Sequence, residues 1–197
     1  EHNSNSTESI CTWYSIMSYL LANPEYADSI IDMSQQVQVS RRPKLSYEVI
    51  GTVFKVTASG TNLRWGEQVS TTSMLTGKLI MGARFYLRKV GSPTGNLTCD
   101  IYDNSNNKVA TMGTVDSSTV PTAETIYDFW GSSWQIPQGQ AARVVIEYAA
   151  GQSGNHIEVK TVGADRFDGA NTKLTWWTGS TWSTSNGEDC GGGIWTL

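Results

Sequence analysis

Three tryptophans near the C-terminal end are the residues whose type and spacing best suggest a chemistry. Trp176 and Trp177 precede a Thr-Gly-Ser turn, and Trp182 follows it. Neighbouring residues of a strand point to opposite faces, so a hairpin here would turn at least one indole outward and another inward. An exposed indole offers a flat apolar face on which a sugar ring can stack. These residues and Trp65 are candidates for a carbohydrate site; the alternative is an aromatic pair that only stabilises the sheet.

Catalytic groups are scarce in the sequence. His2 and His156 are the two histidines, and neither a Gly-x-Ser-x-Gly elbow nor a phosphate-binding loop occurs. Glu188 and Asp189 are adjacent, so on a strand they would point to opposite faces and could not act as the carboxylate pair of a glycoside hydrolase. We therefore predict a non-enzymatic protein.

The charge and the hydropathy of the chain argue against two classes of partner. The formal net charge is −4, which provides no field to attract a polyanion such as nucleic acid. The most apolar early stretch, residues 10–21, is too short and too interrupted by Ser and Thr to cross a bilayer. We expect neither nucleic-acid binding nor membrane insertion.

The three cysteines do not form a recognisable motif. Cys11, Cys99 and Cys190 lie far apart and match neither a zinc site nor a redox pair. One disulfide with one remaining thiol and three buried thiols fit the sequence equally well.

Most of the chain has the pattern of short β-strands joined by tight turns. From about residue 35 apolar and polar residues alternate, and clusters of Gly, Pro, Asn and Asp separate the alternating segments. The clearest strand candidates are residues 51–57, 78–89, 97–102, 108–113, 124–130, 141–148, 156–161, 173–177 and 192–197. The pattern predicts an all-β chain that folds as an antiparallel two-sheet sandwich over residues 35–197.

The same alternation predicts which side chains fill the core. The residues expected there are Phe85, Leu87, Ile101, Val145 and Ile194, and the large indoles of Trp130 and Trp134 are also expected to be core.

Residues 1–34 have a different period, which predicts a separate N-terminal helical arm. Apolar residues from Ile10 to Leu21 recur at the spacing of one helix face, and Asn23-Pro24 marks the start of a second short helix. Such short amphipathic helices are stable only when they are packed. We expect Trp13, Met17 and Leu20 to contact other subunits, either further copies of the chain or other structural proteins. The alternative is that the helices cap one open end of the same subunit's sandwich.

The order of the segments resembles a jelly-roll domain. Residues 85–98 follow the sequence strand, Gly, small residue, Pro, small residue, Gly, strand. This arrangement is similar to the core of a jelly roll common in phage and archaeal-virus structural proteins and in secreted surface proteins. The stretches 134–139, 148–155 and 176–189 agree with it, so the likeness covers about residues 54–197. It implies a jelly-roll sandwich related in shape to carbohydrate-binding modules.

Acidic loop residues are candidates for a calcium site. Calcium takes oxygen ligands, and extracellular β-sandwiches often use it to fix loop shape. The resemblance places a loop acid at Asp189, so we expect Asp165, Asp168 and Asp189 to be the ligands if calcium binds. Asx-rich turns also form without a metal ion, so these acids do not require calcium. The expected function requires no cofactor.

Two functions follow from these patterns. The first is a non-enzymatic structural or attachment protein of a virus particle or an extracellular filament, which assembles through its N-terminal arm. The alternative is a lectin-like module that binds a glycan through its surface tryptophans. Both place the protein outside the cell or on a virion surface.

Overall fold

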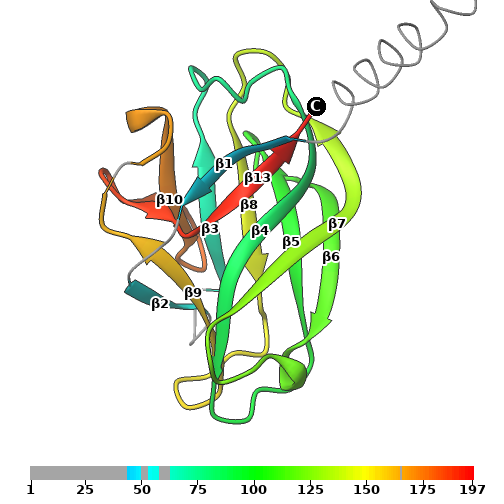
Figure 1. The fold of residues 1–197 in the computed structure, drawn as a ribbon, viewed down its shortest axis with the longest axis vertical. Coiled ribbons are helices and arrows are strands. Elements are labelled where there is room, and N and C mark those ends of the chain that lie inside the picture. The colour runs from blue at the N-terminus through cyan, green and yellow to red at the C-terminus, as the bar shows by residue number, and fades with distance from the viewer. Residues whose placement is uncertain (1–43, 50–52, 58–62, 165) are drawn as a thin grey trace, which may run out of the picture. The chain divides into compact units, whose positions relative to one another are not determined.

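The computed structural model describes residues 44–49, 53–57, 63–164 and 166–197 of this chain (Figure 1). The predicted N-terminal arm, including Trp13, Met17 and Leu20, lies outside the described residues. Among the described residues, no helix is both long and apolar enough to cross a membrane.

The described residues form an all-β, antiparallel sandwich. In chain order, its strands are β1 (Lys44–Val49), β2 (Val53–Thr57), β3 (Arg64–Val69), β4 (Leu79–Val90), β5 (Asn96–Asp103), β6 (Lys108–Asp116), β7 (Thr125–Gln135), β8 (Ala142–Glu147), β9 (His156–Val162), β10 (Thr172–Trp177), β11 (Trp182–Thr184), β12 (Asp189–Cys190) and β13 (Gly192–Thr196). Two short 3-10 helices, η2 (Ser117–Thr119) and η3 (Gly169–Asn171), lie in connections between strands.

The strands divide into two sheets that form two layers. In the seven-stranded sheet, the long strand β4 pairs with β7 along one edge and with β13 and then β9 along the other. Strand β1 pairs with β13, and β9 also pairs with β2 and β12. The six-stranded sheet has the order β11-β10-β3-β8-β5-β6. In Figure 1, β1, β13 and β4 cross in front of β3 and β8.

The core lies between the two sheets and is filled by alternate residues of facing strands. Val144 and Ile146 of β8 belong to it, as do Phe85 and Leu87 of β4. Aromatic rings of neighbouring strands also pack in the core: the ring centroids of Phe85 in β4 and Phe129 in β7 are 6.3 Å apart in an edge-to-face arrangement. Burial of this apolar surface is the main force that holds the sandwich closed.

The structure confirms most of the strands that the sequence predicts, with ends that differ by a few residues. The prediction missed β3, whose polar and glycine residues obscure the alternation. All five predicted core residues are buried. Val145, however, is buried on the opposite side of its sheet from the core, because Val144 and Ile146 are the residues of β8 that enter the core cluster. The prediction for Trp130 was wrong: this indole is 50% exposed.

Candidate functional site: a charged and aromatic sheet face

The candidate site is the face of the six-stranded sheet that points away from the core. In β3, Trp65 and Val69 enter the core cluster, so alternation turns Arg64 to the other side. Paired residues of antiparallel strands share a face, and Arg64 is paired with Glu147 of β8. We call the following residues on this side the charged face: Arg64, Asp100, Tyr102, Lys108, Arg143, Glu147, Trp177 and Trp182.

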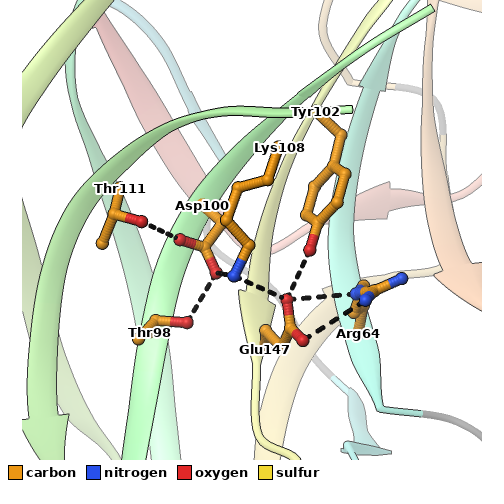
Figure 2. Close-up of polar contacts among 7 residues, drawn as sticks. All are labelled: Arg64, Thr98, Asp100, Tyr102, Lys108, Thr111 and Glu147. Atoms are coloured by element: carbon orange, nitrogen blue, oxygen red, sulfur yellow. Dashed lines mark hydrogen bonds and ion pairs between the residues drawn. The ribbon is translucent and has the colours of Figure 1, made fainter. Parts of the chain in front are cut away.

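Asp100 of β5 is a buried carboxylate within the charged face, with 0% of its surface exposed. It accepts hydrogen bonds from the hydroxyls of Thr98 and Thr111, each at 2.5 Å, and forms an ion pair with Lys108 at 2.9 Å (Figure 2). Thr98 lies on β5 with Asp100, and Thr111 lies on β6 with Lys108. Three donors therefore compensate the loss of hydration around this carboxylate.

Glu147 of β8 connects the two ends of the network in Figure 2. Its carboxylate pairs with the Arg64 guanidinium at 3.1 Å and with Lys108 Nζ at 3.2 Å, and it accepts a hydrogen bond of 2.5 Å from the Tyr102 hydroxyl. Lys108 thus bridges Glu147 and Asp100. The five side chains come from four strands and form one connected network.

The network fixes the protonation state of its members. Burial by itself would raise the pKa of Glu147, but the hydrogen bonds from Arg64 and Tyr102 outweigh it, so this pKa lies below its ordinary value. Burial and the hydrogen bond to Glu147 raise the pKa of Tyr102 to about 12. Near neutral pH Glu147 is therefore charged and Tyr102 is protonated. A general acid or base needs a pKa near the working pH. The network lowers the pKa of Glu147 and raises that of Tyr102, so both pKa values lie further from neutral pH.

Aromatic rings and guanidinium groups cover the same face. The Trp182 ring contacts the Trp177 ring at 5.3 Å and the Tyr102 ring at 5.5 Å, both edge to face. The Arg64 guanidinium lies 4.8 Å from the centre of the Tyr102 ring and 5.1 Å from that of Trp177. Arg143 stacks on Trp182 at 4.9 Å. These cation–π contacts place apolar rings and charged hydrogen-bond donors side by side.

The four tryptophans named from the sequence divide between the two sides of the sheet. Trp177 and Trp182 are a cross-strand pair on the charged face. Trp176 packs against the core, where its ring stacks on Trp65 at 5.2 Å and 15°. Trp65 is only 9% exposed. The neighbouring indoles of Trp176 and Trp177 therefore point to opposite sides, as alternation requires. Trp65 is a core residue, and Trp176 is partly buried against the core.

The two described acids expected to hold calcium, Asp168 and Asp189, accept hydrogen bonds from different groups. Asp168 accepts from the Ser73 hydroxyl at 2.7 Å and the Met74 amide at 2.8 Å. Buried Asp189 accepts from the Arg166 amide at 2.6 Å and that of Phe167 at 3.1 Å. Asp165 lies outside the described residues. Within the described ranges, no group of three or more His, Cys, Asp or Glu residues is arranged to hold a metal ion.

Two further tryptophans lie away from the charged face. Trp130 of β7 is exposed on the outside of the seven-stranded sheet, where its ring contacts that of Trp195 at 5.0 Å. Trp134 packs against the core and borders a surface cavity of about 300 Å³ beside Asp103, Asn104 and Gln140. The exposed indole of Trp130 provides a comparison for the partly buried indoles of Trp177 and Trp182.

Comparisons with known proteins give no relative: no family model, no curated protein and no solved structure matches the chain. The fold itself therefore defines the class, an antiparallel β-sandwich with a charged and aromatic sheet face. Sequence reasoning missed the polar half of this face. The two partners of its central ion pair, Arg64 and Glu147, are 83 residues apart in the chain, and only the strand order brings them together.

Proposed function

We propose that this protein is a non-enzymatic attachment module that binds glycans through its charged face. The observation that carries the proposal is the pair Trp177 and Trp182, which lies on the outer side of the sheet beside two arginines. Sugar rings pack their apolar faces on indoles, and their hydroxyls take hydrogen bonds from neighbouring charged groups. The charged face offers both features within one cluster.

The ion-pair network supports this proposal through rigidity. Arg64 is held by Glu147 and by two aromatic rings, so its donors have a fixed direction before a ligand arrives. Preorganised groups lose less conformational entropy on binding. The low pKa of Glu147 and the high pKa of Tyr102 favour a binding role over proton transfer.

The wider proposal retains the likeness that the sequence suggests. We place the sandwich among jelly rolls related in shape to carbohydrate-binding modules, and the protein on a virion or in the extracellular space. Residues 1–34 would then attach the module to further copies or to other structural subunits. Light scattering on the full chain and on a chain without residues 1–34 tests this part: a folded monomer that no longer assembles supports it, and an unchanged assembly or an unfolded product contradicts it.

Binding to a glycan array tests the central proposal. We expect the wild-type chain to bind, and Trp177→Ala and Trp182→Ala to lose about two- to twelvefold in affinity, since ring-stacking contacts are worth roughly 0.5–1.5 kcal/mol. Trp130→Ala is the matched control, because it removes an exposed indole from the other sheet. Binding should survive that change.

Three outcomes would reject the proposal. An array without any bound glycan would contradict glycan binding. Loss of binding in Trp130→Ala, with normal binding in Trp177→Ala, would move the site to the seven-stranded sheet. Cleavage of a bound oligosaccharide during overnight incubation, detected by mass spectrometry and abolished in Glu147→Gln, would make the protein an enzyme.

A further inference from the structure

The charged face has an unequal number of positive and negative groups. Among the residues defined above as the charged face, the cations are Arg64, Lys108 and Arg143, and the carboxylates are Asp100 and Glu147. Three positive charges against two negative ones leave an excess of one positive charge on this face, although the chain as a whole carries a net charge of −4. The excess is therefore a local feature.

The ion pairs show which cation provides the excess. Arg64 pairs with Glu147, and Lys108 pairs with both Asp100 and Glu147. Arg143 has no carboxylate partner in the part of the chain that the structure describes; its one polar contact there is a 3.5 Å hydrogen bond from Nη1 to the Asn106 side chain. Arg143 is thus the cation of this face without a counter-charge.

The surroundings of Arg143 have one feature of an anion-binding site, a partly buried guanidinium without a carboxylate partner among the described residues. Its side chain is half-buried, its Nε is buried without a hydrogen-bond partner, and its guanidinium lies against the Trp182 ring. Burial lowers the pKa of this guanidinium because no nearby carboxylate offsets the loss of hydration. A planar guanidinium matches a carboxylate or sulfate through two parallel hydrogen bonds. An anion here would therefore supply the missing partner.

We infer that the ligand of the charged face is an acidic saccharide, whose carboxylate or sulfate group pairs with Arg143 while its ring packs beside Trp182. This inference rests on the proposed function and specifies the class of glycan. A nucleic acid fits the face less well, because its regularly spaced phosphates require a track of cations, and here one spare cation lies on an acidic protein.

Matched pairs of saccharides test the inference. The probes are oligogalacturonate and its methyl ester, sialyllactose and lactose, and a sulfated galactan and its desulfated form. We expect the full chain to bind an acidic member at least about tenfold more tightly than its neutral partner, the ratio that one charge-assisted hydrogen-bond pair provides. The pair with the largest ratio identifies the anion, carboxylate or sulfate.

Two substitutions locate the charge that is responsible. Arg143→Met should remove the preference for the acidic member, because it deletes the guanidinium that would pair with the anion. Arg84→Met is the control for general electrostatics, since it deletes one positive charge near Trp195 on the other sheet. It should retain the preference. Circular dichroism shows whether each variant is folded, and Arg143→Lys is a second variant, expected to keep part of the preference.

The outcomes separate this inference from the proposed function. Equal binding of acidic and neutral members by wild type would overturn the inference and leave glycan binding intact. An acidic preference that survives in Arg143→Met or disappears equally in Arg84→Met would also overturn it. No binding of any saccharide would overturn both. Binding of single-stranded nucleic acid in competition with the saccharide would replace the inferred ligand.

Discussion

Trp182 and Tyr102 lie on strands that three other strands separate, yet their ring centroids are 5.5 Å apart. In a flat sheet these two strands would be roughly 19 Å from each other, at about 4.8 Å per strand. The two side chains must therefore lean toward each other across the sheet. This arrangement covers the face and places the arginines against aromatic rings, which makes the charged face one connected cluster.

Removal of the Asp100 charge should destabilise the fold. In Asp100→Asn the buried site loses its charge, and one of the two oxygens that accept from Lys108 and the two threonine hydroxyls is replaced by an NH2 donor. We expect a loss of about 2 kcal/mol in the free energy of unfolding, less than for a fully buried pair because Lys108 is partly exposed. Urea unfolding measures it.

The control for this change is Asp128→Asn on the other sheet. Asp128 pairs with Arg84 at a more exposed position, so we expect a cost below about 1 kcal/mol. Equal costs for the two variants would show that the buried network adds nothing beyond a surface ion pair.

The stability of the protein should depend on Glu147 in acid. Because the pKa of this carboxyl is lower in the folded state than in the unfolded state, its contribution is fully present above the unfolded-state pKa. The contribution is lost as the pH falls through the folded-state pKa. We therefore expect the difference in unfolding free energy between wild type and Glu147→Gln to be constant near neutral pH and to shrink below about pH 4.

Chemical unfolding at a series of pH values provides this comparison. A difference that stays constant down to pH 3, or one that widens in acid, would contradict a lowered pKa for Glu147.

Sequence reasoning identified the sandwich because its main signal, the alternation of apolar and polar residues, is local. It missed β3 because Gly66 and the polar residues beside it weaken that signal. The glycine has a tertiary reason: a Cβ at this position would lie 2.0 Å from the Val144 carbonyl oxygen. Such a close approach between β3 and β8 is invisible in the sequence of β3 alone.

The charged face was predictable only in part. The turn between Trp177 and Trp182 indicated a hairpin with one outward indole, which is a property of neighbouring residues. Tyr102, Arg143 and Glu147 gave no such signal, because a charged or aromatic residue in an exposed strand position is common. Their association depends on the pairing of β8 with β5 and β3, and periodicity does not encode strand order.

The two described cysteines should be unreactive in the folded protein. Cys99 and Cys190 are buried free thiols. Burial raises the pKa of both, and the nearby carboxylates Asp100 for Cys99 and Glu67 for Cys190 add to this effect. Since the thiolate is the reactive form, we expect no labelling by Ellman's reagent until the chain unfolds.

The experiment uses Cys11→Ser, so that only these two thiols remain. Two thiols should titrate in urea and none in native buffer. Rapid labelling of the native chain, or a mass lower by two protons that marks a disulfide between them, would contradict the structure.

The adjacent residues Trp176 and Trp177 should differ sharply in their effect on stability. Trp176 is partly buried, packs against the core and stacks on Trp65, so Trp176→Ala should cost about 3 kcal/mol. Trp177 lies on the outer side, where it contacts Trp182 and Arg64, so Trp177→Ala should cost about 1 kcal/mol. The two variants remove the same side chain from neighbouring positions of one strand, so helix or strand propensity cancels in the comparison. Urea unfolding of both variants gives the difference. Equal losses would contradict the difference in burial between the two sides of β10, and a larger loss for Trp177→Ala would mean that β10 presents the opposite side to the core.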